Sequence, residues 1–188
     1  MVPPFIELTN LTKNFGNGKG IFDLSFGVQQ GEVFGFLGPN GAGKSTTIRH
    51  LMGFMKPQSG SCQIMGKDCF SQAALIQQSV GYLAGEIAFI EDMSGISYLN
   101  FIADMKGIRD RSSIRDLLYR FELNPRGKIK KMSKGMKQKI GLVAAFMGDP
   151  SVLILDEPTS GLDPLMQNRF GKTSRMELSP GRQSFCHV

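Results

Sequence analysis

Residues 33–46 read VFGFLGPNGAGKST, and this stretch decides how the chain folds. Its first five residues are apolar or glycine, as in a strand buried within a sheet. The following residues, from Gly38 to Gly43, are rich in glycine and proline, which is typical of a turn. A helix is then predicted over residues 44–55, and it ends before Pro57. A buried strand, a glycine-rich turn and a helix in immediate succession predict an α/β fold with a parallel sheet.

The turn matches the pattern G-x-x-x-x-G-K-[ST], which cradles the phosphates of a nucleotide. Glycines let the backbone curl so that successive N–H groups point at phosphate oxygens, and the following helix adds the positive end of its dipole. Lys44 would supply a charge to the β- and γ-phosphates, and the Ser45 hydroxyl would ligate Mg²⁺. The alternative is a turn without a ligand, and the position between a buried strand and a helix argues against it. We therefore expect nucleotide contacts from Gly38, Pro39, Asn40, Gly41, Ala42, Gly43, Lys44, Ser45 and Thr46.

A second buried strand is expected at residues 152–155, and two carboxylates follow it. Ligands of parallel sheets lie outside the carboxyl ends of the strands, where these acids would stand. Asp156 is suited to hold Mg²⁺ together with Ser45, and Glu157 is suited to polarise a water molecule for attack on the γ-phosphate. Two acids after a strand are more often an ordinary surface feature, but here a phosphate-binding turn precedes them. We predict Glu157 as the catalytic residue.

Two further stretches complete a pattern that resembles the ATP-binding subunits of ABC transporters. Residues 132–138 read MSKGMKQ and are similar to the signature motif of that family, and residues 160–163 read SGLD and are similar to its D-loop. Phe15 is similar in position to the aromatic residue that stacks on adenine. The resemblance covers residues 5–170, and it looks closest to the branch of multidrug and bacteriocin exporters.

The resemblance implies an ATPase that uses ATP and Mg²⁺ and whose two copies close head to tail over two ATP molecules. Ser133 and the backbone near Gly135 would then meet the γ-phosphate held by the other copy, and Asp163 would contribute to the same nucleotide site. Ser133 would cap a helix in either case. A transmembrane permease is the implied partner, so the chain would be cytoplasmic and peripheral on the inner face of the cell membrane.

The implied fold is an α/β P-loop NTPase core with an N-terminal antiparallel β subdomain and an inserted α-helical subdomain. Residues 5–8 and 22–28 alternate apolar and polar residues, as half-buried strands do. Amphipathic helices are expected within the insert, which spans about 86–135. The ATP-binding domain would then cover residues 1–170.

The composition suits a single globular domain of 188 residues, with 41% hydrophobic and 20% charged residues. A formal charge of +6 favours anionic partners in general. We take this charge as spread along the sequence without a basic block, and we expect no nucleic-acid partner. The start lacks the pattern of a signal peptide, and no apolar run approaches the roughly 20 residues that cross a bilayer. The cysteines, at positions 62, 69 and 186, show no metal-binding spacing and are expected to be unpaired thiols without a special role.

The signature stretch and the loop before the insert depart from the family pattern. Lys134 and Met136 replace a glycine and a glutamine. Glu86 stands near the position of the family's Q-loop glutamine. It either acts near Mg²⁺ or is a solvated acid.

The largest departure begins after residue 170, where the family would continue with a helix, a strand and a histidine that contacts the γ-phosphate. Residues 171–188 show no such pattern and are expected to be an atypical tail outside the fold. His187 lies near the expected distance from Glu157, but no apolar strand precedes it, so we interpret its position as a coincidence. A frameshift would explain the tail and would predict ATP binding with weak or absent hydrolysis; sequencing the gene tests this hypothesis.

Two other functions remain open at this point. One is a soluble ABC-type ATPase that acts on ribosomes or DNA, although the chain carries neither a second such domain nor a long coiled-coil insert. The other is a nucleotide-binding relic or regulatory subunit that does not hydrolyse ATP, which the atypical tail keeps open.

Overall fold

The structure is a computed structural model that describes residues 3–168, 170 and 184–187. Its N-terminal part is an antiparallel sheet of four strands. The first two strands form a long hairpin, in which Asn17 and Gly18 both have positive φ, as a type I′ turn requires. The first strand therefore extends well beyond the expected residues 5–8. In spatial order the strands are β2 (Lys19–Val28), β1 (Ile6–Gly16), β4 (Ser59–Ile64) and β5 (Lys67–Asp68).

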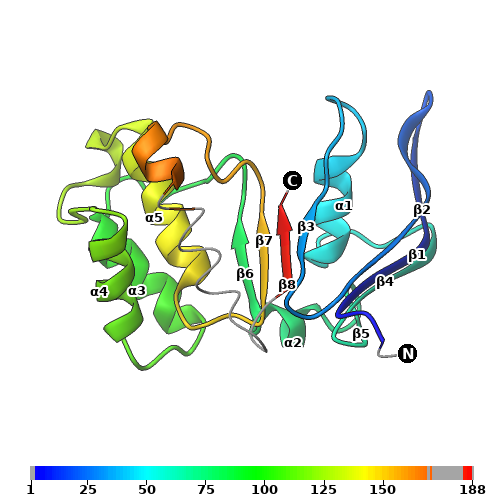
Figure 1. The fold of residues 1–188 in the computed structure, drawn as a ribbon, viewed down its shortest axis with the longest axis horizontal. Coiled ribbons are helices and arrows are strands. Elements are labelled where there is room, and N and C mark those ends of the chain that lie inside the picture. The colour runs from blue at the N-terminus through cyan, green and yellow to red at the C-terminus, as the bar shows by residue number, and fades with distance from the viewer. Residues whose placement is uncertain (1–2, 169, 171–183, 188) are drawn as a thin grey trace.

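The second sheet is parallel, and its register brings the carboxyl ends of its strands to one edge (Figure 1). Its central strand β7 (Val152–Leu155) is buried along its whole length. Val152 and Ile154 belong to one hydrophobic cluster, and Leu153 and Leu155 belong to the other, so the strand is covered on both faces. This explains the unbroken apolar run in the sequence. In spatial order the strands are β3 (Val33–Gly35), β8 (Ser184–His187), β7 and β6 (Val80–Leu83).

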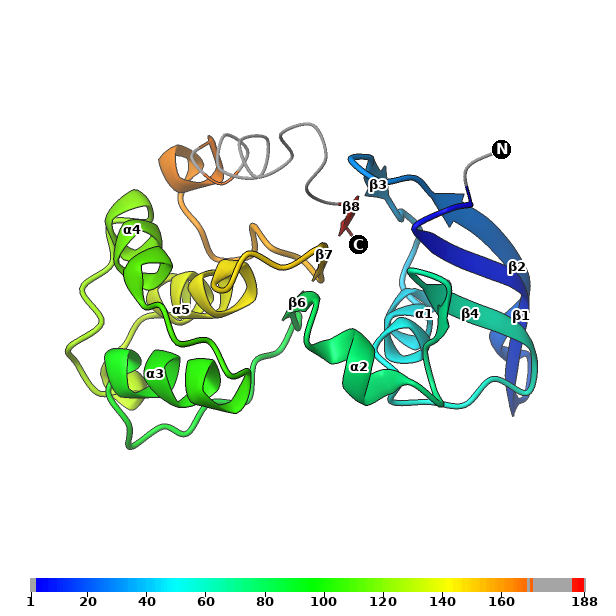
Figure 2. The same ribbon diagram turned by 90° about the horizontal axis from the view of Figure 1, so that it is seen from below.

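Helix α1 (Lys44–Leu51) lies between the two sheets, and three helices cover the opposite face of the parallel sheet (Figure 2). The expected helix over residues 44–55 ends earlier, because the chain turns at Gly53, which has a positive φ of 71°. The covering helices are α3 (Gly95–Met105), α4 (Ser112–Arg120) and α5 (Lys134–Phe146). Shorter helical elements are α2 (Ala73–Gln77), the 3₁₀ helix η1 (Ile129–Lys131) and the helical residues 164–168.

These elements agree with the expected fold class. The helical insert expected at about 86–135 contains α3, α4 and η1, and α3 is capped by Ser94, whose hydroxyl accepts from the Ser97 backbone N–H. Within the part of the chain that the structure describes, no helix combines the length and the apolar character that a membrane span requires.

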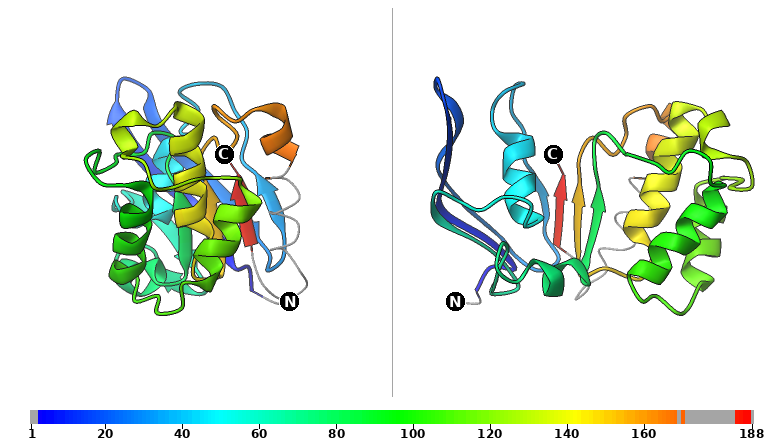
Figure 3. Two further views of the ribbon diagram at one scale, coloured as in Figure 1. Left: turned by 90° about the vertical axis from the view of Figure 1, so that its left-hand side faces the viewer. Right: turned by 180° about the vertical axis from the view of Figure 1, so that it is seen from behind.

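Strand β8 corrects the expectation that the tail lies outside the fold. Its four residues pair in parallel with β7 on one side, and the last three of them pair in parallel with β3 on the other (Figure 3). The run Ser-Phe-Cys-His is short and mixed in polarity, so no periodic pattern marks it as a strand. Ladder hydrogen bonds with two neighbours are available to any backbone that reaches this position. Residues 171–183 lie outside the described residues, and a domain limit at residue 170 remains a prediction.

Candidate nucleotide-binding site

The glycine-rich turn leads directly into the N-terminus of α1. Gly41 and Gly43 have φ values of 87° and 90°, in the left-handed region that glycine adopts without strain. Gly43 is the N-cap residue, and a Cβ at this position would collide with the Ile21 side chain. No side chain among the described residues caps the first turn of α1. The loop can therefore present its backbone N–H groups and the helix dipole to an anion.

Lys44 reaches back over the loop that precedes it. Its Nζ donates hydrogen bonds to the carbonyl oxygens of Gly38 at 2.6 Å and of Pro39 at 3.1 Å. The first turn of the helix is reinforced by Thr47, whose hydroxyl donates to the Gly43 carbonyl at 3.0 Å. The lysine charge is therefore held at the mouth of the loop.

The loop forms one wall of a cavity of about 900 Å³. This volume lies in the range of pockets that bind small molecules and cofactors. Five segments contribute to it, namely the end of β1, the start of β2, the loop with α1, the carboxyl end of β6 and the carboxyl end of β7. Of the predicted residues, the cavity is lined by Phe15, Asn40, Gly41, Gly43, Lys44, Ser45, Thr46, Asp156 and Glu157. Gly38, Pro39 and Ala42 belong to the same loop but do not line the cavity.

The carboxylates after β7 stand opposite the loop. The backbone N–H of Asp156 donates to the Leu83 carbonyl at 2.9 Å, which ties the end of β7 to the end of β6. Burial, together with the Asp156 charge, raises the pKa of Tyr82, which lines the same cavity. A Cβ at Gly85 would lie 3.2 Å from the Asp156 carboxyl group. Glu86 also lines the cavity, so this wall carries three acidic side chains.

The oxygen donors in the cavity fit Mg²⁺. Ser45 and Asp156 offer a hydroxyl and a carboxylate to the same space. Within the described ranges, no group of three or more His, Cys, Asp or Glu residues could hold a metal by itself. Mg²⁺ is usually held by one or two protein oxygens together with substrate phosphates, so this sparse donor set suits a metal that arrives with a nucleotide.

Glu157 has an unusual backbone conformation that a second residue supports. Its φ is 46°, in the left-handed region that is uncommon for residues other than glycine. The buried side chain of Gln138 donates from Nε2 to the carbonyl oxygens of Glu157 and Pro158, each at 3.2 Å. Sequence reasoning did not single out Gln138, although it ends the signature stretch at residues 132–138.

The remaining predicted residues do not line the cavity. Ser133 is the N-cap of α5 and accepts from the Met136 backbone N–H at 3.2 Å. Gly135 packs against Gly161, since a Cβ on Gly135 would come within 2.7 Å of the Gly161 carbonyl oxygen. The Asp163 carboxylate accepts from the Met166 backbone N–H at 2.9 Å and caps the helical residues 164–168. All three therefore have a local structural role within one copy of the chain.

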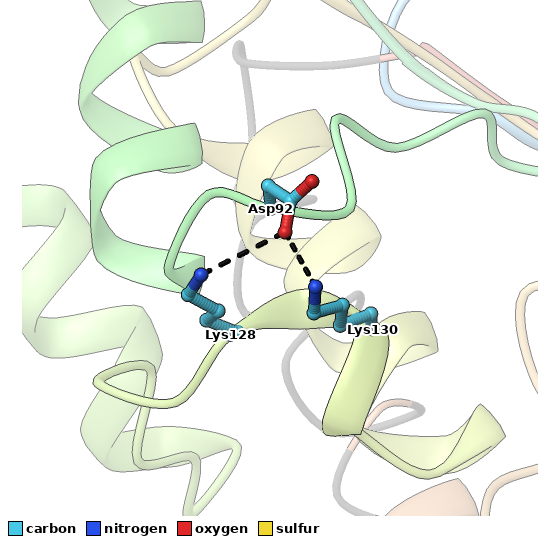
Figure 4. A network of polar contacts seen from close by, with 3 residues as sticks. All are labelled: Asp92, Lys128 and Lys130. Carbon is cyan, nitrogen blue, oxygen red and sulfur yellow. Dashed lines mark hydrogen bonds and ion pairs between the residues drawn. The ribbon is translucent and has the colours of Figure 1, made fainter.

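A basic segment surrounds the N-terminus of α5. Residues 126–139 contain seven Lys or Arg residues and no acid, so the expectation of an evenly spread charge is wrong here. Asp92 pairs with Lys128 at 3.7 Å and with Lys130 at 2.6 Å (Figure 4). Two other lysines of this segment, Lys131 and Lys134, have no ion-pair partner within the described residues.

His187 is the last residue of β8. Its backbone is in register with Leu155 of β7 and with Gly35 of β3. It therefore lies at the carboxyl edge of the sheet, next to the residues that precede Asp156 and the phosphate-binding loop. His187 is the last residue of a strand, but the three residues before it, Ser-Phe-Cys, are mixed in polarity and are not the apolar strand that the resemblance implies. Its side chain lies outside what the structure describes, so a role for it remains a prediction.

A family model, curated relatives and solved structures are all similar to this chain, and they point to the same family. The family model described as ABC transporter matches residues 21–160. The bacitracin transport ATP-binding protein BcrA of Bacillus licheniformis is 40% identical over 162 residues, which cover 85% of this chain and 53% of BcrA. The probable multidrug ABC transporter ATP-binding protein YbhF of Escherichia coli is 35% identical over 170 residues, which cover 88% of this chain and 29% of YbhF. The chain spans about half the length, or less, of the curated relatives it matches.

Solved structures match over nearly the whole chain. A structure described as the ATP binding subunit of an ABC transporter has a TM-score of 0.87 and 28% identity, over 97% of this chain and 78% of the other. A dimeric bacterial ABC transporter cassette has a TM-score of 0.86 over 97% of this chain and 87% of the other. Its 20% identity supports the fold alone.

Proposed function

Because the chain belongs to the ABC transporter family of ATP-binding domains, we propose that it binds Mg-ATP and hydrolyses it to drive substrate movement through a partner membrane permease. The observation that carries this proposal is that the phosphate-binding loop and the two carboxylates after β7 line the same cavity. Two relatives are named for bacitracin and multidrug transport, which supports a transporter of the export type. The permease would hold the chain at the cytoplasmic face of the cell membrane.

Binding would begin at the loop and at the aromatic ring beside it. Phe15 is 51% exposed on the cavity wall, where its ring can stack on adenine. The N–H groups of the loop and the dipole of α1 would receive the phosphates. Lys44 would exchange its bonds to the carbonyls of Gly38 and Pro39 for bonds to phosphate oxygens, which carry a full charge and therefore attract the ammonium more strongly.

Hydrolysis would take place at the opposite wall. Glu157 would accept a hydrogen bond from a water molecule and orient its oxygen in line with the γ-phosphorus. The water oxygen would bond to phosphorus as the bond to the bridging oxygen breaks, while the water proton passes to Glu157 and then to the released phosphate, which yields ADP and inorganic phosphate. Ser45 and Asp156 would hold Mg²⁺, which neutralises charge on the β- and γ-phosphate oxygens.

The residues outside the cavity would act on a second copy of the chain. We propose a head-to-tail dimer in which Ser133 and Gly135 meet the γ-phosphate held by the other copy, with Asp163 at the same interface. The N-terminal end of α5 suits a negative charge because of its dipole. Lys134, in the first turn of that helix, would add a positive charge. This is consistent with the basic character of residues 126–139.

The test is calorimetric titration of the purified chain with Mg-ATP, together with a phosphate-release assay. Lys44→Ala should lose ATP binding, because it removes the charge at the mouth of the loop. Lys67→Ala is the matched control, since Lys67 lies in β5 and does not line the cavity. Equal binding by both variants and the unaltered chain would contradict the proposed nucleotide site.

A further inference from the structure

Cys62 of β4 and Cys69, the residue after β5, lie directly opposite each other. The hairpin of β4 and β5 pairs Gln63 with Asp68 and Ile64 with Lys67, so the next pair along the ladder is Cys62 and Cys69. The Cys69 backbone N–H donates to the Cys62 carbonyl at 2.9 Å, and the two Sγ atoms are 3.3 Å apart. Both thiols are free in this structure, which agrees with the expectation of unpaired cysteines, but the sequence did not indicate that the two lie in contact.

We propose that Cys62 and Cys69 form a reversible disulfide within the chain when it meets a small-molecule disulfide such as oxidised glutathione. The Cys69 thiolate attacks one sulfur of the small disulfide and releases one equivalent of the small thiol. The Cys62 thiol then loses its proton and attacks the Cys69 sulfur, which releases the second equivalent. The two cysteines are oxidised, and one molecule of the small disulfide is reduced to two thiols.

The backbone geometry permits this bond without a large movement. Directly opposite residues of an antiparallel pair have Cα atoms about 4.5–5.5 Å apart, and disulfides span Cα separations of about 4.4–6.8 Å. The sulfur atoms must approach from 3.3 Å to a bond length of about 2 Å. Rotation of the two side chains covers this difference. The hairpin itself can therefore stay in place.

The position of Cys69 at the edge of the sheet provides a route for the reagent. Both side chains are buried, with exposed fractions of 2% for Cys62 and 1% for Cys69. Strand β5 has only two residues and pairs with β4 alone, and the residues after Cys69, Phe70 and Ser71, are exposed. Opening of this short edge would expose Cys69 while the rest of the sheet stays paired.

The two thiols have different roles in the exchange. Cys62 donates its S–H to Cys69, and this hydrogen bond, together with burial, raises the pKa of the Cys62 thiol. When Cys69 attacks the reagent, the hydrogen bond from the Cys62 S–H to the Cys69 sulfur is lost. Cys62, in the interior strand β4, is therefore the thiol that closes the disulfide in the second step.

The disulfide would close the hairpin that supports the far end of α1. Cys62 belongs to the same hydrophobic cluster as Ile48 and Leu51 of that helix, and the Cys69 carbonyl abuts Gly53, just beyond its end. Lys44 is at the other end of the helix, which rises by about 1.5 Å per residue. The cross-link should therefore raise thermal stability and leave the nucleotide cavity unchanged. From the length of the closed loop we expect a rise in Tm of about 5 °C.

The experiment uses the full chain with Cys186→Ser, which leaves only Cys62 and Cys69 of its three cysteines. The folded protein is incubated with oxidised glutathione below its melting temperature. It is then denatured and treated with an alkylating reagent, and its mass is measured by mass spectrometry. We expect both thiols to be lost together, a mass lower by two hydrogen atoms, and no retained glutathione. Dithiothreitol should restore both thiols and reverse the rise in Tm.

The single variants Cys62→Ala and Cys69→Ala in the same background cannot form the bond and should show no rise in Tm. If these variants fold poorly, the thiol count and Tm of the Cys186→Ser protein, which retains Cys62 and Cys69, still test the proposal. Retention of both thiols, a stable adduct with glutathione, or thiol loss only at temperatures that unfold the chain would each overturn the proposal. None of these readouts depends on ATP hydrolysis.

Discussion

The side-chain amide of Gln138 donates to the backbone carbonyl of Glu157 at 3.2 Å, and to that of Pro158 at the same distance. Helix α5 is therefore linked directly to the residue that follows Asp156. Glu157 has a positive φ, a conformation that persists only where the surroundings hold it. We therefore infer that the signature stretch positions the proposed catalytic carboxylate of its own chain, in addition to its proposed contact with the other copy.

Replacing Gln138 with methionine tests this positioning role. Gln138→Met keeps a similar shape but removes the side-chain donor from both carbonyl oxygens. The Glu157 carbonyl still accepts from the Ser160 backbone N–H at 3.0 Å, so the cost of about 1–3 kcal/mol for an unsatisfied buried group falls on the Pro158 carbonyl. We expect kcat for ATP hydrolysis to fall about tenfold or more, with the Kd for Mg-ATP unchanged. Gln77→Met is the matched control, because the Gln77 amide also donates to a carbonyl, that of Met52 at 2.8 Å, but away from the cavity. Equal loss of kcat in both variants would indicate a general effect on stability.

Glu157→Gln tests whether the chain hydrolyses ATP at all. The amide keeps the shape of the side chain but cannot act as a base, so phosphate release should fall at least about 100-fold. Binding of Mg-ATP, measured by calorimetry, should remain. If the unaltered chain and the variant release phosphate at the same rate, the hydrolysis-deficient alternative is favoured.

Lys134→Ala tests the charge at the proposed dimer interface. In the Glu157→Gln background, ATP should promote dimers, and removal of this charge should weaken them about threefold, as expected for an exposed ion pair between an ammonium and a phosphate. Added salt should reduce the difference, because it screens exposed charges. Sedimentation velocity at several ATP and salt concentrations measures both effects.

Lys128→Ala is the control for this measurement. Lys128 belongs to the same basic segment, but Asp92 lies 3.7 Å from its Nζ. A loss of dimers as large as that in Lys134→Ala would argue for a general effect of net charge rather than a contact with phosphate.

His50 predicts how stability depends on pH. It is buried in α1, and its Nδ1 lies 2.8 Å from the Thr46 carbonyl oxygen. Burial lowers the pKa of His50 and the Lys13 charge lowers it further, while the bond to Thr46 opposes the shift. The unfolded chain therefore binds a proton more readily below the ordinary pKa of 6.5, and the folded state loses stability as the pH falls below that value.

Urea unfolding at pH 7 and pH 5 measures this effect. The decrease in unfolding free energy between the two pH values should be smaller in His50→Leu than in the unaltered chain, because leucine takes up no proton. The comparison uses the slope with pH, so a change in the overall stability of the variant does not affect it. An identical slope in both proteins would assign the acid sensitivity to other groups.

Much of the candidate site could be predicted from local patterns. The turn from Gly38 to Ser45 lies between a buried strand and a helix, as its glycines require, and Asp156 and Glu157 follow a strand that is apolar on both faces. The turn and the strand each depend on residues that are adjacent in the sequence, so the pattern of apolar residues and glycines predicts them directly. The helix boundaries were less accurate, as the early end of α1 shows, since a glycine with positive φ ends it before the apolar pattern does.

By itself, the sequence determined the fold class, the phosphate-binding loop and the carboxylates opposite it, because each is encoded within a short continuous stretch. Only the tertiary structure decided that Cys62 touches Cys69, that Gln138 holds Glu157, and that the last strand, β8, lies between β3 and β7. The physical reason is that these contacts depend on which backbone groups and side chains folding brings together across the chain. Neither the periodicity of apolar residues nor the local composition predicts which distant residues come into contact.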